Sequence, residues 1–403
     1  MKKNVIRTAL FSVVLLAGMG QAFAFDAAAR IVMKGSLVTS TNDPETKTTK
    51  YDFLQNNQTT QKDPDGIEIA MNGDVAGAHV ALWYITESQK GEDDWAAYFR
   101  RSYIWVKPVK YVKLRFGYNG TDGFFKERID QWKVGSPFAI AKRNWDPIPT
   151  YINCSDVEGW GFGAEVYPID GLILNAAIAP AKSNPSMSFT AGDNEKDFTY
   201  TPWGAGARYY WNNLSFQASY RDGGQKKWKV VRAGVGYDGD GIYGFFQPIL
   251  GLNYNSKTEK LEATGLCLDM YGEYSYDAFK ILVHAPVTVR FKATTSDPHY
   301  MELNVLGKYN FGTFGSIDDL SPYLNVKTIS TDDDVTYRAW QLNQNFVNSF
   351  DIAIVPGVEM KIGRALLNVG AEFDIYSKFE RENGNVKGAA WNWSVPFKVE
   401  IGF

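Results

Sequence analysis

Long apolar runs are absent from this 403-residue chain beyond its first two dozen residues. No later stretch reaches the about 18 apolar residues that a membrane-spanning helix needs, so the sequence excludes helical spans. Cysteine is scarce as well, and the two residues present, Cys154 and Cys267, are too few for a disulfide framework. The sequence leaves open whether these two cysteines form one bridge in an oxidising compartment or stay as free thiols.

Histidine is nearly as scarce, and the usual signatures of catalysis are missing with it. The three histidines, His79, His284 and His299, have no neighbouring serine in a recognisable nucleophile motif. The acidic runs at 63–66 and 332–334 are explained by turn chemistry and by a solvated loop, without calcium. We therefore expect no enzymatic activity, no cofactor and no metal. A formal net charge of -3 gives no sign of nucleic-acid binding.

The N-terminus has the pattern of a secretory signal peptide, with a basic region, a short apolar core and an A-x-A cleavage site. Its parts are Lys2, Lys3 and Arg7, then Leu10 to Ala17, then Ala22-Phe23-Ala24. Cleavage after Ala24 removes three basic residues and no acid, which leaves residues 25–403 with a formal charge of -6. An exported chain without helical spans is either soluble outside the inner membrane or a β-barrel.

Strict alternation of apolar and polar residues is the strongest pattern present. Counting back from the end, every second position is apolar: Phe403, Ile401, Val399, Phe397, Val395, Trp393 and Trp391. Successive side chains of a strand point to opposite faces, so one face of this segment is apolar and the other is mostly polar. The same period recurs at 112–118, 279–292, 301–311, 350–362 and 367–376. Such runs suit tilted transmembrane strands, which need about 9–11 residues.

Aromatic residues gather near the ends of the apolar faces, where the headgroup level of a bilayer favours amphipathic rings. Examples are Phe279, Phe291, Phe350, Trp203 and Trp211. The chain is 15% aromatic, so such girdles can be built at both interfaces.

Short and long connections alternate along the chain. Eight short turns are predicted at 72–74, 107–108, 168–171, 212–213, 238–241, 276–277, 312–319 and 363–364, and nine longer polar segments lie between them, the first at 41–64. They delimit about eighteen strands with both termini on the periplasmic side. Sixteen is the alternative, because Arg100 and Arg101 put charge on both faces of one strand. Either a bulge lies there or the count differs.

The signal, the alternating strands, the pattern of connections and the final segment Val399-Glu400-Ile401-Gly402-Phe403 together resemble the outer-membrane porins of bacteria with two membranes. The resemblance implies an all-β, up-and-down antiparallel transmembrane barrel over residues 25–403 in the cell outer membrane. It also implies contact with outer-membrane lipid, recognition of the strand ending at Phe403 by the barrel-assembly machinery, and homotrimers as a frequent assembly. Barrels of 16–18 strands leave an aqueous channel, so we expect passive diffusion of small hydrophilic solutes.

The longest connection, 120–158, is also the third long one. In porins the third external loop usually folds inward, so the resemblance makes its charged residues candidates for a pore constriction: Lys126, Glu127, Arg128, Asp130, Lys133, Lys142 and Arg143. A solvated surface loop is the equal alternative. Charges of both signs there favour a transverse field over strict ion selection.

Placing the apolar faces against lipid assigns the remaining charged residues to the lumen. Those singled out are Lys113, Arg115, Arg208, Arg232, Lys280, Arg290, Lys292, Glu302, Lys308, Asp351, Glu359, Glu372 and Asp374. The middle strands are mainly basic and the later strands carry more acidic residues, so we expect opposite walls of the lumen to carry net charges of opposite sign. We expect the channel to have a weak or mild preference for anions.

Two alternatives stay open. Five tyrosines fall on the lumen face: Tyr111, Tyr210, Tyr271, Tyr300 and Tyr376. They could bind sugar rings, as in a sugar-specific porin. Incidental placement explains them more simply, because the chain has 23 tyrosines. A surface adhesin or structural barrel is the competitor from another class, and the modest external segments favour a pore over it.

Overall fold

A computed structural model describes the chain at residues 24–43, 47–56, 65–87, 94–119, 159–181, 202–223, 228–291, 299–331, 344–345, 349–376, 379–381, 386–387 and 390–402. Within these residues the regular secondary structure is β-strand throughout. Twenty-one strands form one antiparallel sheet, and three short ones form a second sheet. A search of this part of the chain for a helix long and apolar enough to cross a membrane finds none.

The strands of the large sheet are β1 Ala24–Asp43, β2 Thr48–Asn56, β3 Asp65–Asn72, β4 Ala76–Glu87, β5 Asp94–Val109, β6 Val112–Asn119, β7 Gly159–Val166, β8 Leu172–Ala181, β9 Trp203–Trp211, β10 Leu214–Asp222, β11 Lys229–Gly239, β12 Ile242–Asn255, β13 Lys260–Tyr276, β14 Phe279–His284, β15 Val287–Arg290, β16 His299–Tyr309, β17 Asp319–Thr331, β19 Ser349–Ile362, β20 Ala365–Gly370, β21 Glu372–Tyr376 and β24 Ala390–Gly402. The small sheet contains β18 Gln344–Asn345, β22 Phe379–Arg381 and β23 Val386–Lys387.

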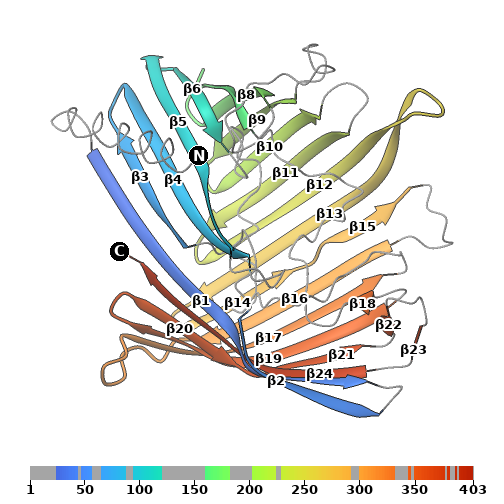
Figure 1. The fold of residues 1–403 in the computed structure, drawn as a ribbon. Helices are drawn as coiled ribbons and strands as arrows, with labels where there is room; N and C mark the ends of the chain where they lie inside the picture. The colour runs from blue at the N-terminus through green and yellow to red at the C-terminus, as the bar shows by residue number, and fades with distance from the viewer. Residues whose placement is uncertain are drawn as a thin grey trace.

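The large sheet closes on itself where β1 pairs with β24, from Arg30↔Gly402 to Thr41↔Asn392. Three positions around the ring each hold two strands in line. These are β2 and β3 along β1, β14 and β15 between β13 and β16, and β20 and β21 between β19 and β24. The 21 strands therefore occupy eighteen positions. Figure 1 shows β5 to β10 on one side of the ring and β17 to β24 on the other. A closed ring has no unpaired edge, which membrane insertion requires.

Two of the predicted strands are interrupted. The segment 279–292 breaks into β14 and β15 at Pro286, which has no amide hydrogen to give to the ladder. The segment 367–376 breaks at Ala371, whose amide donates to the carbonyl of Pro356 over 2.9 Å. In both cases the side-chain alternation continues across the break, so the face of each residue is unchanged.

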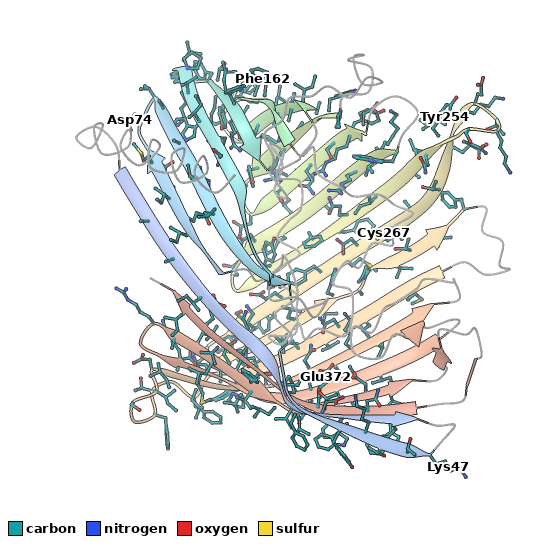
Figure 2. The ribbon with its side chains drawn as sticks, viewed as in Figure 1. Lys47, Asp74, Phe162, Tyr254, Cys267 and Glu372 are labelled. Atoms are coloured by element: carbon teal, nitrogen blue, oxygen red, sulfur yellow. The ribbon has the colours of Figure 1, made fainter. Side chains whose placement is uncertain are left out.

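The short connections lie between strands near the predicted positions. The turn between β5 and β6 is displaced, because β5 continues through Pro108 and the turn falls at Lys110 and Tyr111. Asn212 and Asp277 adopt φ of 51° and 50° in two of the turns. Short polar side chains tolerate this left-handed conformation better than other residues. Figure 2 labels Asp74 in the short turn after β3 and Lys47 at the tip of the β1–β2 hairpin.

The segment 41–64 was predicted as a polar loop, and this prediction is wrong for its middle part. There β2 returns along β1 in the register Asp43↔Thr48 to Gly35↔Asn56. Tyr51 and Phe53 alternate with polar neighbours on this strand and are exposed, so the period-two pattern was present but short. The hairpin is tied to β24 because the Asn42 side chain donates to the carbonyl of Trp391 over 2.7 Å.

Arg100 and Arg101 mark a β-bulge. In the β4–β5 ladder Ala81 pairs with Arg101 and Leu82 pairs with Phe99, which leaves Arg100 as the extra residue. Of the two explanations that the sequence allowed for charge on both faces of this strand, the bulge is the one observed.

Burial alternates along the strands. On β20 and β21 the apolar residues Val369, Phe373 and Ile375 are exposed, whereas Glu372 and Asp374 are buried. The predicted girdle residues Phe279, Phe291, Trp203 and Trp211 are exposed too, while the side chain of Phe350 lies outside the described residues. Phe403, the predicted end of the final strand, also lies outside them. We call the apolar, exposed side of the sheet the outer face and the polar side the inner face.

Candidate functional site

The candidate site is the inner face of the ring. It holds nine of the predicted lumen residues by strand alternation, namely Lys113, Arg115, Arg208, Arg232, Lys280, Lys308, Glu359, Glu372 and Asp374. The side chains of Arg290, Glu302 and Asp351, and all of Lys292, lie outside the described residues. So do the constriction candidates Lys126, Glu127, Arg128, Asp130, Lys133, Lys142 and Arg143.

Cations lie against aromatic rings on β5 and β6. The Nζ atoms of Lys107 and Lys113 are 5.3 and 4.8 Å from the ring centroid of Trp105. The Arg115 guanidinium is 5.7 Å from the ring of Tyr103 and forms an ion pair with Glu165 on β7. Rings attract cations through their negative faces without neutralising them. This part of the wall therefore keeps a positive excess.

Three arginines follow on the adjacent strands β9, β11 and β10. Arg208 pairs in register with Gln217, and Arg232 pairs with Ser219 two residues further along β10, which places Arg221 one step beyond it. Measured along β10, the three residues therefore lie at successive inner-face levels, with Arg208 nearest the short turn, Arg232 next and Arg221 farthest from it. We call these three residues the arginine row. Arg221 and Arg232 are 0% and 2% exposed.

A band of apolar side chains interrupts the polar inner face. It contains Phe245, Tyr271, Leu282, Leu306, Tyr323 and Val355, from six strands between β12 and β19. Phe245 and Tyr271 stack with ring centroids 5.5 Å apart. Only Tyr271 of this band was predicted on the lumen face, because the more apolar face of each strand was assigned to lipid. The available signal was a large apolar residue at the polar parity, as at Phe245.

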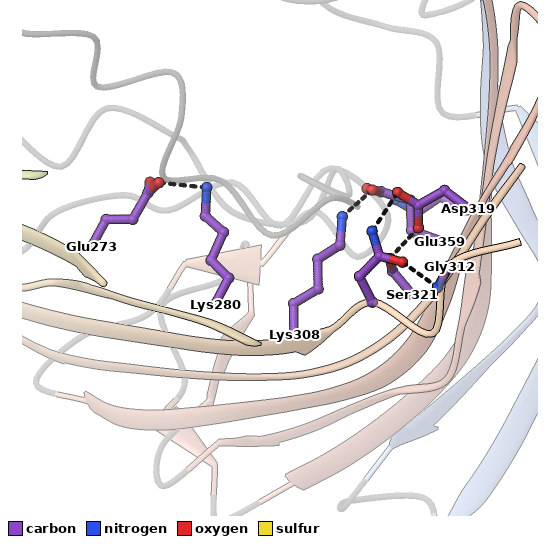
Figure 3. A network of polar contacts seen from close by, with 9 residues as sticks. Glu273, Lys280, Lys308, Gly312, Asp319, Ser321 and Glu359 are labelled. Carbon is purple, nitrogen blue, oxygen red and sulfur yellow. Dashed lines mark hydrogen bonds and ion pairs between the residues drawn. The ribbon is translucent and has the colours of Figure 1, made fainter. Parts of the chain in front are cut away.

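Charges next to the band, nearer the short turns, are paired across strands (Figure 3). Lys280 and Lys308 stand directly opposite each other in the β14–β16 ladder. Like charges in such a position destabilise a sheet unless each has an opposite charge nearby. Lys280 meets Glu273 at 2.6 Å on one side, and Lys308 pairs with Glu359 on the other. This row, which we call the compensated row, carries no net charge.

A buried polar layer lies on the other side of the apolar band. His284 Nε2 is 2.6 Å from Asp269 Oδ1, and both side chains are almost wholly buried. The Asn325 amide donates to Asn304 Oδ1 over 2.5 Å. Cys267 is buried on the same face of β13 (Figure 2), and Cys154, its possible partner in the sequence, lies outside the described residues.

Acidic residues occupy the wall formed by β20, β21 and β24. Glu372 and Asp374 are buried on the inner face, and Ser394 donates to Glu372 Oε2 over 3.4 Å. Lys398 lies 3.1 Å from Glu400. In a ring of eighteen positions, β20 and β21 stand nine positions from β9. The acidic wall and the arginine row therefore face each other across the ring (Figure 1).

The residues that the structure describes show no group of side chains suited to bind a metal ion. In the described ranges, no three His, Cys, Asp or Glu side chains gather closely enough to hold an ion.

Comparison with known proteins identifies the fold. No protein-family model and no curated protein sequence matches the chain. Among solved structures, Pseudomonas aeruginosa OccK2 (OpdF), in complex with glucuronate, aligns with a TM-score of 0.54 at 9% identity over 95% of this chain and 99% of its own. The outer membrane protein opdK of the same organism gives 0.52 at 11% identity over 94% and 98%.

A BenF-like porin from Pseudomonas fluorescens Pf-5 aligns with a TM-score of 0.53 at 11% identity over 94% of this chain and 98% of its own. These identities are low, so the likeness shows the fold: the chain has the antiparallel β-barrel fold of bacterial outer-membrane porins.

Proposed function

We propose that this protein is an outer-membrane porin, a water-filled channel through which small hydrophilic solutes diffuse passively, with a mild preference for anions. The observation that carries the proposal is a closed ring of eighteen positions whose outer face is apolar and whose inner face bears the arginine row. Barrels of 16–18 strands enclose an aqueous channel, whereas about eight strands pack full. The solved porins of the same fold support the reading.

The anion preference rests on an imbalance between parts of the inner face. The compensated row contributes two cations and two acids, so it adds little net field. The arginine row adds positive charge, and the acidic wall across the ring limits its effect. Charged rings set selectivity through the local field, and opposed walls produce a transverse field with weak selection. OccK2 was crystallised with glucuronate, an anionic sugar acid, which is compatible with this preference.

The proposal also covers export and assembly. Residues 1–24 would be removed as a signal peptide, residues 25–403 would form the barrel in the outer-membrane lipid, and the final strand ending at Phe403 would be read by the barrel-assembly machinery. A homotrimer is the assembly we propose, since porins often adopt it. The outer aromatic girdle supports the membrane placement.

The test is conductance of the refolded protein in planar bilayers. We expect ion-conducting steps and, in a potassium chloride gradient, a reversal potential that indicates a small excess of chloride permeability. Absence of conductance would contradict the channel and favour a surface adhesin or structural barrel. Strong cation selectivity would leave the channel standing and contradict the anion preference.

A further inference from the structure

A recess opens at the short-turn end of β6 to β9. It has a volume of about 440 Å3 and is lined by Lys110, Tyr111, Tyr167, Ile169, Asp170, Gly171, Leu172, Ile173 and Tyr210. Two of the tyrosines considered for sugar binding from the sequence, Tyr111 and Tyr210, meet in it, and Tyr167 joins them. Three phenol rings from three different turns and strands thus share one concave surface.

The backbone around the recess is fixed by hydrogen bonds. The amide of Tyr167 donates to the carbonyl of Tyr111 over 2.8 Å, and the amide of Tyr210 donates to the carbonyl of Gly171 over 2.8 Å. Gly171 has φ of +80°, and a Cβ at this position would lie 2.4 Å from the carbonyl oxygen of Tyr210. Only glycine fits there. The recess is therefore preformed, which lowers the ordering cost of binding.

The phenol hydroxyls are held by polar partners from the inner face. Tyr167 donates to Glu165, and Arg208 donates to the Tyr210 oxygen over 3.2 Å. Burial raises the pKa of the Tyr167 phenol above its ordinary value, and the bond to Glu165 raises that pKa further. Tyr167 therefore stays a neutral donor at physiological pH. The Lys110 ammonium lies 4.5 Å from the ring centroid of Tyr111.

The lining selects a ligand by shape and polarity. Lys110 and Asp170, the two charged residues of the lining, have opposite formal charges, so the lining itself carries no net formal charge. Tyr111 and Tyr210 are 49% and 46% exposed as residues, and aromatic rings of this kind favour a flat ligand with C–H groups on its face. The hydroxyls, the lysine and the aspartate supply donors and acceptors around the edge. A pyranose ring has both properties.

We propose that this recess is a binding site for a neutral pyranose ring at the short-turn mouth of the barrel. The inference rests on the proposed channel function, because the ring would reach the site by diffusing through the lumen or by entering from that mouth. A neutral sugar would dwell there and obstruct the ions that pass.

The experiment measures block of ion current through single channels of the full mature chain by added maltose. Sorbitol, which has hydroxyl groups and no ring, is the chemical control, and glucuronate is the charged control. We expect a saturable fall in current with maltose, a much weaker effect of sorbitol, and no advantage of glucuronate over maltose.

Matched variants locate the site. Tyr111→Ala and Tyr210→Ala each remove one phenol face and should weaken block about five- to tenfold, while the Tyr→Phe variants keep the ring and should lose about twofold. Tyr209→Ala is the control, because Tyr209 precedes Tyr210 and points to the outer face. If an alanine variant fails to insert, the phenylalanine variant of the same residue carries the test.

The experiment distinguishes a channel that does not bind sugar from a protein that does not form a channel. Conductance without saturable maltose block overturns the sugar site and leaves the porin proposal intact, whereas absence of conductance overturns the porin proposal itself. Equal block by sorbitol overturns ring recognition, and stronger block by glucuronate overturns the assignment to a neutral ligand. Block that is unchanged in Tyr111→Ala and Tyr210→Ala overturns the location.

Discussion

The two walls of the ring handle charge in different ways. On the inner face of β5 to β11 the cations lie on aromatic rings or in the arginine row, with Glu165 as an acid partner of Arg115. Lys229 pairs with Asp222 between β11 and β10. On β13 to β24 lysines and carboxylates alternate in ion pairs, and Glu372 and Asp374 add acid beyond them. An aromatic ring holds a cation without removing its field, whereas a carboxylate cancels most of it. In the proposed channel, the first wall would attract a passing anion, and the second wall is closer to neutral or acidic.

The largest expected effect follows from removing the arginine row. The triple variant Arg208→Gln, Arg221→Gln and Arg232→Gln leaves the acidic wall unopposed, so the mild anion preference should turn into a cation preference. A shift of roughly tenfold in the chloride-to-potassium permeability ratio corresponds to only about 1.4 kcal/mol. Reversal potentials in a potassium chloride gradient measure it. An unchanged ratio would show that ions do not pass near this row.

Neutralising the acidic wall should act in the opposite direction and less strongly. In the double variant Glu372→Gln and Asp374→Asn the arginine row loses its counter-charge, so chloride selectivity should rise about two- to threefold. The same reversal-potential measurement applies, and Asp277→Asn, which removes an exposed carboxylate from the β13–β14 turn, is the matched control. A fall in chloride selectivity would contradict the transverse-field description.

Breaking one ion pair of the compensated row should mainly affect stability. Lys308→Gln leaves the Glu359 carboxylate without its lysine partner, and both side chains are only about a quarter exposed, at 24% and 23%. We expect a loss of about 1 kcal/mol in the free energy of unfolding. Urea unfolding in detergent measures this loss. The double variant Lys308→Gln and Glu359→Gln should recover part of it, and additive losses would mean that the two residues do not interact.

Raising the salt concentration should change the ion selectivity of the channel less than the substitutions in the arginine row or the acidic wall. The Debye length falls from about 10 Å at 0.1 M to about 3 Å at 1 M, so the arginine row should select less well between ions as the salt concentration rises. The anion preference of the wild type and the cation preference of the triple variant should therefore both decline toward no preference, and the difference between the two channels should shrink. A selectivity that does not depend on salt would argue for steric selection instead.

Much of the architecture could be predicted from the sequence because its physical signals are local. A side chain's face depends only on its parity within a strand, so Glu372 and Asp374 could be placed opposite Phe373 and Ile375 without knowing their neighbours. Turn residues such as Asn212 and Asp277 mark hairpins through their own backbone preferences. The breaks at Pro286 and Ala371 were missed, because alternation continues through them.

The candidate site was only partly predictable. Charged inner-face residues such as Arg208 and Lys280 were identified by parity, but their partners were not, because Lys280 reaches Glu273 and Lys308 reaches Glu359 through strand register. Register between strands has no signature in either strand alone. The apolar band around Tyr271 was missed for a related reason: six residues from six strands form it, and each is a single exception in its own segment.

By itself, the sequence determined that this protein is a large antiparallel β structure with a lipid-compatible face and a polar face, since alternation along each segment sets both. Only the tertiary structure decided which charged side chains pair with one another and which walls face each other. Ring closure sets the arginine row opposite Glu372 and Asp374, and the turns bring Tyr111, Tyr167 and Tyr210 to one recess. These arrangements depend on distances between residues far apart in the chain, which pairing across the whole sheet establishes.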